Sequence, residues 1–427
     1  MLEESRITAS NDEHAEAHQF AFEPAAARLE REGHDIEALL DRIASFEVAV
    51  PSWALETGGT RFGRYPGPGE PRNIYEKMDD VAVIQQLTRA TPRVSLHIPW
   101  DEPDDVGALG EHADELGLGF DAVNSNTFQD QSGQEHSYKF GSFSHTDRAV
   151  RQQAIEHNLR VVELGEELGS EAITIWLADG SNYPGQMHLR KSFDRVLGCL
   201  QRVYDALPSD WRLYTEHKPY EPAFYATVVQ DWGSSLMFAN HLGEQAQCLV
   251  DLGHHLPNTN IELVVARLLT AGKLGGFHFN DSKYGDDDLT TASIKPYQLF
   301  LIFNELVDAQ KEGLQGFDPD YMIDQSHNLK DPIEAFLQTA DQLQKAYVKA
   351  LLVDRERLAT YRAKNDVLKA ENTLKEAYET DVGPLVAEAR RRQNGALAPV
   401  AAFRASGYRE SRHEERSEGA YNPPQSL

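Results

Sequence analysis

Residues 247–255 read Gln-Cys-Leu-Val-Asp-Leu-Gly-His-His (QCLVDLGHH), and the fold prediction depends on the pattern in this stretch. Its first half is almost continuously apolar, which is typical of a parallel strand covered on both faces. Its second half turns polar at Asp251 and His254. The following segment, from Asn260 to Ala271, has apolar residues at helical spacing. A buried strand followed by a helix is the repeating unit of α/β proteins.

The same unit recurs along much of the chain. Eight strand-length runs are present: residues 46–53 (FEVAVPSW), 93–100 (RVSLHIPW), 119–125 (GFDAVNS), 172–178 (AITIWLA), 212–218 (RLYTEHK), 247–255, 276–282 (GFHFNDS) and 321–328 (YMIDQSHN). Helical periodicity separates most of them, at residues 81–90, 148–168, 190–206, 260–271 and 298–312. Because strands and helices alternate, the sequence predicts a (β/α)8 TIM barrel rather than a run of strands followed by a run of helices.

The chain is longer than such a barrel requires. A barrel needs about 250 residues, and the chain has 427, so we expect helical additions. The predicted division is an N-terminal helical extension (1–45, with an amphipathic helix at 25–43), the barrel (46–332), a C-terminal helical extension (333–405) and a mobile tail (406–427). Two long helices are expected in the C-terminal extension, at 335–365 and 366–392, the second interrupted at Gly383-Pro384.

Polar side chains gather at one end of the strand-like runs. The residues concerned are His97, Asn124, Trp176, Glu216, Lys218, Asp251, His254, His278, Asp281 and Asp324. One strand that ends in a polar residue means little, but seven of the eight runs do so. In (β/α)8 barrels the carboxyl ends of the strands form the catalytic face. We therefore expect a functional site at this end.

The residue types at this face indicate a metal site. Divalent cations remove the repulsion that clustered carboxylates would otherwise suffer. Oxygen-rich donor sets with some imidazole suit Mn2+, Mg2+ or Co2+ better than thiol-seeking metals. The sequence therefore predicts a two-metal site in which Glu216 can bridge the cations. The candidate ligands are Glu216, Asp251, His254, His278, Asp286, Asp288 and Asp324.

Two interpretations stay open at single positions. The acidic loop Asp286–Asp288, taken alone, would be a solvated turn, although residues 286 and 288 can point one way while Asp287 points out. Lys218 lies two residues after Glu216, on the same face of the strand. It is either a substrate contact or a structural counter-charge.

The amino-acid composition argues against several classes of binding partner and of structural site. Lys and Arg number 41 against 68 Asp and Glu, for a formal net charge of -27. Such a surface repels phosphate backbones and anionic lipid, which argues against nucleic-acid and membrane binding. The two cysteines, Cys199 and Cys248, cannot form a disulfide framework or a cysteine-based zinc site. The N-terminal residues lack an apolar signal segment, and the expected location is cytoplasmic.

Several stretches resemble the L-rhamnose isomerase family, in particular its broad-specificity bacterial members. They include VPSWALETGGTRFGRYPGPGEPRN (50–73), VIQQLTRATPRVSLHIPWD (83–101), YTEHKPYEPAFY (214–225), LVDLGHHLPNTNIE (249–262) and GGFHFNDSKYGDDDL (275–289). The resemblance implies a xylose-isomerase-like barrel and a homotetramer. It also implies two divalent metal ions per subunit, typically Mn2+, with Co2+, Mg2+ or Zn2+ as alternatives.

Carried over by position, the resemblance also assigns roles. A substrate-orienting metal would be bound by Glu216, Asp251, His278 and Asp324, and a catalytic metal by His254, Asp286 and Asp288. His97 would open the sugar ring and would join Lys218, Asp286 and Asp324 in the catalytic set. The sugar would contact Trp53, Phe128, Trp176 and Lys218. Phe62 would reach across the tetramer and line the neighbouring sugar site.

The predicted reaction is the interconversion of L-rhamnose and L-rhamnulose, and of other aldoses such as D-allose, by a metal-mediated hydride shift. A ketose 3-epimerase of the same barrel superfamily is the alternative, but that chemistry usually uses one metal, and Asp286 and Asp288 argue for a second. A DNA phosphodiesterase on a related barrel conflicts with the charge of -27. A non-catalytic sugar-binding protein does not require seven ligand-type residues at one face.

Overall fold

The computed structural model describes residues 1–56, 67, 69–326 and 329–416. Each of the eight predicted runs contains a strand, and two of the runs are split into short halves. The strands are β1 (Val50–Pro51), β2 (Arg93–Ser95), β3 (His97–Ile98), β4 (Gly119–Phe120), β5 (Val123–Ser125), β6 (Ala172–Trp176), β8 (Arg212–Glu216), β10 (Ala246–Asp251), β11 (Leu274–Phe279) and β12 (Asp320–Ile323). Seven of them form one parallel sheet in the order β12-β11-β10-β8-β6-β5-β3, and β1-β2-β4 form a second.

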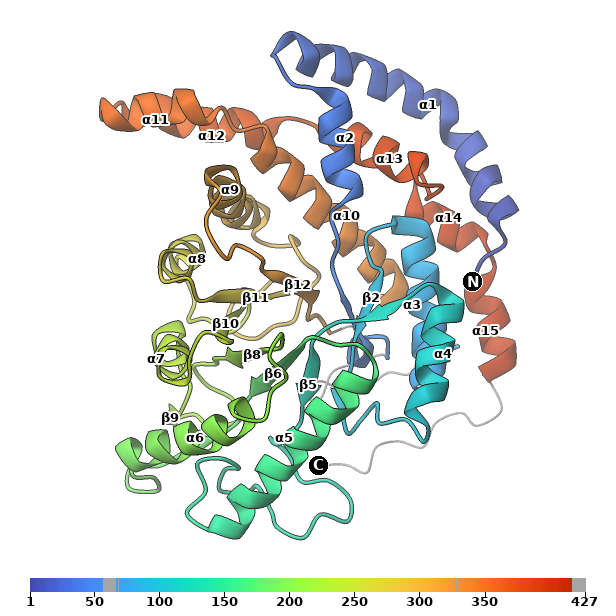
Figure 1. The fold of residues 1–427 in the computed structure, drawn as a ribbon. Helices are drawn as coiled ribbons and strands as arrows, with labels where there is room; N and C mark the ends of the chain where they lie inside the picture. Colours follow the sequence, from blue (N-terminus) through green and yellow to red (C-terminus); the bar gives the residue numbers. More distant parts are fainter. Residues whose placement is uncertain (57–66, 68, 327–328, 417–427) are drawn as a thin grey trace.

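The two sheets are parts of one closed ring. In chain order, β2 leads into β3 and β4 into β5, so the small sheet continues the large one. The seam between β1 and β12 is closed at Ala49, which forms a parallel bridge with Met322. Its N–H donates to Tyr321 over 2.8 Å, and its carbonyl accepts from the N–H of Ile323 over 3.0 Å. The predicted (β/α)8 barrel is therefore confirmed, with a short seam between its first and last strands (Figure 1).

Helices cover the outside of the ring (Figure 1). They are α3 (Ile74–Thr88), α4 (Val106–Leu116), α5 (Arg148–Glu167), α6 (Leu189–Tyr204), α7 (Trp232–Leu242), α8 (Ile261–Thr270), α9 (Pro296–Glu312) and α10 (Pro332–Leu351). Local sequence determines where many of these helices begin and end. In α4, Asp105 caps the first turn by accepting from the N–H of Ala108. The helix ends at Gly117, which has φ of +67°. Apolar side chains fill the space between strands and helices, for example Phe277, Phe279 and Phe303.

The N-terminal extension differs from the single helix predicted at 25–43. It contains α1 (Glu4–Arg31) and α2 (Ile36–Ala44). The break follows from local chemistry, because Gly33 has φ of +94° and Asp35 accepts from the N–H of Ala38 to begin α2. Figure 1 shows α1 and α2 beside the C-terminal helices, with which they pack against one side of the barrel.

The C-terminal extension is also more divided than predicted. Its helices are α11 (Arg355–Ala363), α12 (Val367–Glu379), α13 (Gly383–Arg392), α14 (Pro399–Ala405) and α15 (Tyr408–Arg416). The predicted break at Gly383-Pro384 is confirmed, whereas the helix predicted over 335–365 is wrong because Asp354 caps a new helix. The prediction of a mobile tail from 406 is wrong for residues 408–416, since α15 buries Tyr408 and Arg416. Residues 417–427 lie outside the described chain.

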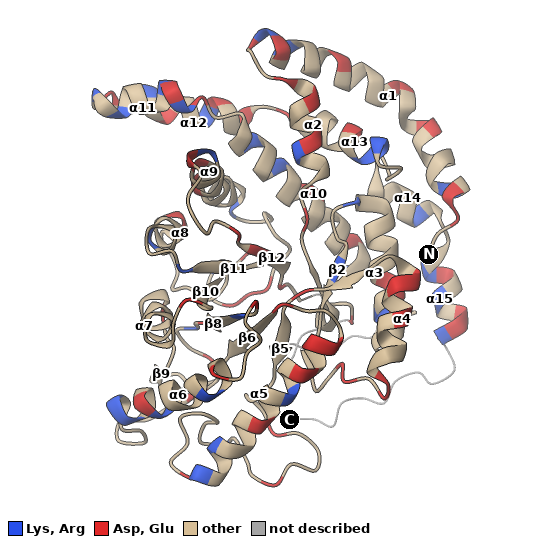
Figure 2. Ribbon diagram, viewed as in Figure 1, with Lys and Arg blue, Asp and Glu red and all other residues tan. Residues whose placement is uncertain are grey.

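Two further observations concern the surface and the thiols. Acidic residues predominate along α1, whereas residues of both charges are mixed along α15 (Figure 2). None of the helices in the described residues is both long and apolar enough to cross a membrane. Cys199 and Cys248 are buried free thiols, and burial raises the pKa of each to about 11.

Candidate metal and sugar site

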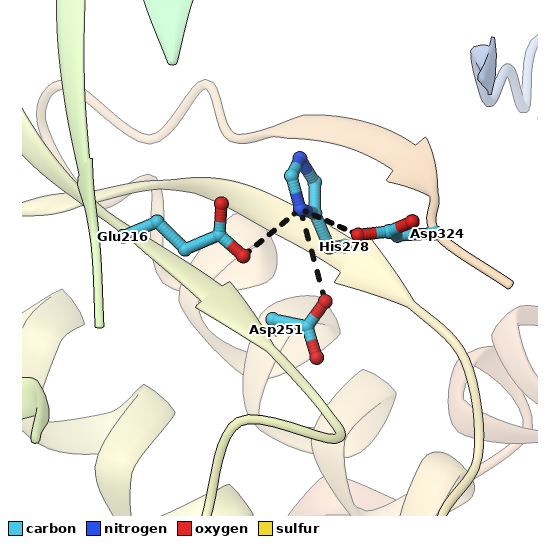
Figure 3. A group of neighbouring side chains, drawn as sticks. All are labelled: Glu216, Asp251, His278 and Asp324. Carbon is cyan, nitrogen blue, oxygen red and sulfur yellow. Dashed lines mark hydrogen bonds and ion pairs between the residues drawn. The ribbon is translucent and has the colours of Figure 1, made fainter. Parts of the chain in front are cut away.

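Four predicted ligand residues meet at the carboxyl ends of neighbouring strands (Figure 3). Glu216 ends β8, Asp251 ends β10, His278 lies in β11 and Asp324 follows β12. Asp251 and His278 are direct cross-strand partners, which brings their side chains together. Nδ1 of His278 lies 3.2 Å from Oε1 of Glu216, 3.7 Å from Oδ2 of Asp251 and 3.5 Å from Oδ2 of Asp324. We call these four residues the first ligand group.

A second ligand group, formed by Asp251, His254 and Asp286, lies next to the first and shares Asp251 with it. Nε2 of His254 lies 3.2 Å from Oδ2 of Asp286, and its Nδ1 lies 2.9 Å from Oε1 of Glu216. The same Glu216 oxygen therefore faces both imidazoles. In each group the ligand atoms all lie within 4.8 Å of one another. Among the described residues, these are the two groups of three or more such side chains that could hold a metal ion.

Asp288 is near this region but is not a member of either group. Its carboxylate accepts a hydrogen bond from the hydroxyl of Ser326 over 3.2 Å, and its carbonyl accepts from the N–H of the same residue. Its φ of +48° is in the left-handed region. Asp287, between the two, accepts hydrogen bonds from the backbone of Tyr284 and Gly285. Asp286 therefore belongs to a ligand group, whereas Asp288 does not, and Asp287 is bound within its own loop.

The buried charges interact strongly. Burial raises the pKa of Asp251 to about 7, against the effect of His254. Burial alone would lower the pKa of both imidazoles. Instead, Glu216 and Asp324 raise the pKa of His278 to about 10. Asp251 and Asp286 likewise raise the pKa of His254 well above its ordinary value. Protonated imidazoles thus supply positive charge among the carboxylates. A metal ion that binds imidazole displaces such a proton, so the donor set fits divalent cations.

Lys218 lies at the edge of the second group. Its Nζ donates to Oδ2 of Asp286 over 2.6 Å and lies 3.3 Å from Oε2 of Glu221. It also lies over the indole ring of Trp176, 5.1 Å from the ring centre. The hydroxyl of Tyr220 donates to the carbonyl of Tyr284 over 3.0 Å and joins this segment to the acidic loop. Lys218 therefore has both a counter-charge partner and a place beside a predicted sugar-binding ring.

Aromatic rings stand next to the ligand groups. His97 has edge contacts with Trp53 and Phe128, at ring-centre distances of 5.3 Å and 5.6 Å, and Phe128 contacts Trp176 at 4.6 Å. These predicted sugar contacts therefore form one wall with His97. Trp100, which sequence reasoning missed, stacks on His97 at 4.2 Å. Its position in the run 93–100, after His97, was the signal that could have identified it.

The side chain of His97 is buried. Burial lowers its pKa to about 4, although Asp101 and Asp324 oppose this shift. Its Nδ1 is buried and has no hydrogen-bond partner among the described residues. The same is true of Nε1 of Trp176. Buried polar atoms without a hydrogen-bond partner are uncommon in folded proteins, and the two nitrogens are therefore compatible with a site that binds a polar ligand.

Two supporting residues were not predicted from the sequence patterns. Asp101 accepts from the backbone N–H of His97 over 2.8 Å, from Nζ of Lys77 over 2.9 Å and from the hydroxyl of Ser52. It therefore joins the strand that carries His97 to the residue before Trp53. Asn280 donates to both oxygens of Asp251, over 2.9 Å and 3.1 Å. Its position two residues after His278, on the same face of the chain, was a usable signal.

Other predicted residues have different surroundings. Asn124 donates to Ser95 inside the barrel, and Asp281 accepts from the backbone N–H groups of Ser282, Ile294 and Lys295. The side chains of Asn124 and Asp281 therefore form hydrogen bonds with nearby groups of the chain, and neither residue belongs to a ligand group. Phe62, predicted to reach a neighbouring subunit, lies outside the described residues.

The comparisons with known proteins agree with this geometry. A solved structure described as L-ribulose 3-epimerase superposes with a TM-score of 0.54 at 16% identity, covering 72% of this chain and 98% of that one. A xylose isomerase of Thermus thermophilus is 28% identical over 267 residues, which are 57% of this chain and 67% of the relative. No family model matches the sequence. The solved structure shares the barrel fold of this chain, and the sequence relatives are described as sugar isomerases.

A relative with higher sequence identity shows the family to which the chain belongs. A probable sugar isomerase of Rhizobium meliloti (strain 1021) is 60% identical over 409 residues, covering 96% of this chain and 95% of the relative. The chain belongs to the same family of sugar isomerases.

Proposed function

We propose that this protein is an aldose–ketose isomerase that interconverts L-rhamnose and L-rhamnulose and accepts other aldoses such as D-allose. The observation that carries the proposal is the pair of ligand groups that share Asp251 at the carboxyl ends of the strands, beside an aromatic wall. Close relatives described as probable sugar isomerases support the reaction class. The choice of L-rhamnose is supported by the sequence stretches that resemble its isomerases.

The two ligand groups suit two divalent cations, and we propose Mn2+, with Co2+, Mg2+ or Zn2+ as alternatives. Glu216, Asp251, His278 and Asp324 would hold one ion, and His254 and Asp286, with Asp288 nearby, would hold the other. The donors are mainly carboxylate oxygens with one imidazole per group, which is the chemistry that such ions prefer. Bound there, the ions would polarise the sugar oxygens at the reacting carbons.

The side chains around the ions have their own parts in the reaction. His97 is a neutral imidazole at neutral pH because burial lowers its pKa to about 4. It would take the proton of the hydroxyl at the anomeric carbon and pass it to the ring oxygen as the bond between that carbon and the ring oxygen breaks, which opens the ring. The ammonium group of Lys218, held beside Asp286 and over Trp176, would donate to a sugar oxygen. Trp53, Phe128 and Trp176 would cover the apolar face of the sugar and exclude water. An apolar wall also suits the methyl group of a 6-deoxy sugar.

A direct assay tests the proposal. The protein is stripped with a chelator, reloaded with Mn2+ or Co2+, and incubated with L-rhamnose, D-allose, D-xylose and matched ketoses. We expect ketose formation from L-rhamnose at the highest kcat/KM, no turnover in stripped protein and recovery on reloading. Conversion of one ketose to its C3 epimer without aldose formation would instead favour the 3-epimerase. Full activity in metal-free protein would refute the two-metal site.

We further propose a homotetramer in which Phe62 lines the sugar site of a neighbouring subunit. The support is the family resemblance, together with the Phe in a Gly- and Pro-rich stretch where an apolar ring would be poorly covered by its own subunit. Sedimentation should give the mass of four chains. Phe62→Ala should raise KM for L-rhamnose more than it lowers kcat, with metal content unchanged. An active monomer would exclude this arrangement.

A further inference from the structure

The C-terminal helix α15 is joined to the barrel by a buried ion pair. Arg416 donates from Nη2 to Oδ1 of Asp80 over 2.9 Å and from Nη1 to Oδ2 of Asp80 over 3.1 Å. Both side chains are almost completely buried, at 2% and 0% exposure. Tyr408 at the other end of α15 also donates to Asp80, over 2.7 Å. Because a buried carboxylate without a partner is costly, this pairing fixes α15 on α3.

The same helix contacts the chain that enters α3. Arg416 donates to the carbonyl of Glu76 over 3.1 Å and to that of Gly69 over 2.8 Å, and Arg409 donates to the same Gly69 carbonyl over 3.1 Å. Gly69 has φ of +70°, and a Cβ atom there would lie 2.8 Å from the backbone nitrogen of His413. The backbone of α15 is thus packed directly on this glycine.

A second contact joins α15 to α10, on the other side of the barrel seam. Arg409 donates from Nε and Nη2 to the two carboxylate oxygens of Asp331, over 2.7 Å and 2.8 Å. Asp331 is the N-cap of α10 and accepts from the N–H of Ile333. One short helix therefore connects α3 and α10, the helices that follow the first strand and the last strand of the ring (Figure 1).

Each of these two helices also holds a segment of the candidate site. From α3, Lys77 reaches Asp101, which binds the backbone of His97 and the hydroxyl of Ser52, next to Trp53. From α10, Thr339 donates to Oε1 of Gln325 over 2.6 Å, and Gln325 follows Asp324 directly. Contacts therefore link α15 through α3 to His97 and Trp53, and through α10 to Asp324.

We propose that Arg409 and Arg416 are positioning residues, and that α15 is a clamp that holds Trp53, His97 and Asp324 in register across the barrel seam. The effect on catalysis rests on the function proposed above, whereas the effect on local order does not. Without the clamp, α3 and α10 would open more often, and both site segments would open with them.

Arg409→Met is the primary variant, because it removes both hydrogen bonds to Asp331. Arg409 also lies 4.0 Å from Asp80, but Arg416 and Tyr408 still donate to Asp80 in this variant. Glu410→Gln is the control, since Glu410 lies on the same helix and its side chain is exposed. Arg409→Lys is the conservative variant. Arg416→Met tests the buried contact with Asp80 on α3, provided that this variant folds.

The experiment is hydrogen–deuterium exchange of the metal-free proteins at a temperature well below unfolding. We expect exchange in peptides covering residues 49–56, 93–101 and 320–326 to rise about tenfold in Arg409→Met, to return towards wild type in Arg409→Lys and to stay unchanged in Glu410→Gln. Mn2+ titration should show a Kd raised about tenfold at the first ligand group. Faster exchange confined to α15, with the three site peptides and the Kd unchanged, would overturn the clamp even if the protein isomerises sugars. An inactive wild-type protein with the expected exchange pattern would instead refute only the proposed function.

Discussion

Nε1 of Trp53 donates a hydrogen bond of 2.9 Å to Oδ1 of Asp324, and this bond crosses the barrel seam. Trp53 belongs to the short 3-10 helix after β1, Ser52–Ala54, and Asp324 follows β12. The other oxygen of Asp324 faces His278 in the first ligand group, at 3.5 Å. A predicted sugar-stacking ring therefore also orients a predicted metal ligand.

Replacing Trp53 with Phe separates these two roles. The ring remains, but the donor to Asp324 is lost, so we expect the Kd of the first ligand group for Mn2+ to rise about tenfold or more. Saturating Mn2+ should restore most of the activity. Trp232→Phe, on the outer helix α7, is the control and should bind Mn2+ like the wild type. An unchanged Kd in Trp53→Phe would show that the hydrogen bond does not orient the ligand.

Asp286→Asn should empty the second ligand group selectively. The substitution keeps the shape of the side chain but removes the charge that pairs with His254 and Lys218. We expect one tightly bound metal ion per subunit instead of two, and kcat lower by about 10–100-fold. Asp287→Asn is the matched control, because the contacts described above join Asp287 to the backbone of its own loop. Two ions and normal turnover in Asp286→Asn would rule out this ligand.

His97 should make stability depend on pH in a defined window. Its pKa falls from 6.5 to about 4 on folding because of burial, so between these values the unfolded chain binds a proton that the folded protein does not. The stability is fully present above pH 6.5 and is lost as the pH falls towards 4, by about 3 kcal/mol. Urea unfolding of metal-free wild type and His97→Asn should show this difference, with exposed His241→Asn as the control. Parallel pH curves for wild type and His97→Asn would contradict it.

The route of the transferred hydrogen can be read from isotope content. In a hydride shift the hydrogen passes directly between C1 and C2 of the sugar, shielded by Trp53, Phe128 and Trp176. We expect ketose formed in deuterated water to contain little carbon-bound deuterium, as measured by NMR or mass spectrometry. Substantial label at C1 or C2 would indicate proton exchange through a side-chain base.

The barrel and much of its site could be predicted because their signals are local. Apolar runs of strand length mark β10 and its neighbours, and parallel strands necessarily bring their carboxyl ends to one face. For this reason the strand pattern by itself predicts that Glu216, Asp251, His278 and Asp324 lie together, as they do in the first ligand group. Asp286 could be predicted to lie at the same face, because it belongs to the loop that follows the carboxyl end of β11.

The features that the sequence patterns did not predict depend on distant partners. Residues 408–416 read YRESRHEER, a composition that favours a solvated segment, yet Arg416 is buried because it pairs with Asp80 on α3. Asp101 supports His97 through a backbone N–H and a lysine from another helix, and neither contact leaves a periodic pattern. Helix boundaries in the extensions failed for a different reason, because caps such as Asp354 interrupt an otherwise continuous helical composition.

The separation of Asp80 and Arg416 by 336 positions in the chain has a consequence for biosynthesis. A ribosome that makes this protein releases the first strand, α3 and the rest of the ring well before α15 emerges. Until then, Asp80 must stay hydrated or take up a proton, because its site has no guanidinium to offset the cost of burial. If α15 holds the seam as proposed, its contacts with α3 and α10 form only after α15 has left the ribosome, and the ordering of Trp53, His97 and Asp324 is then a late step of folding.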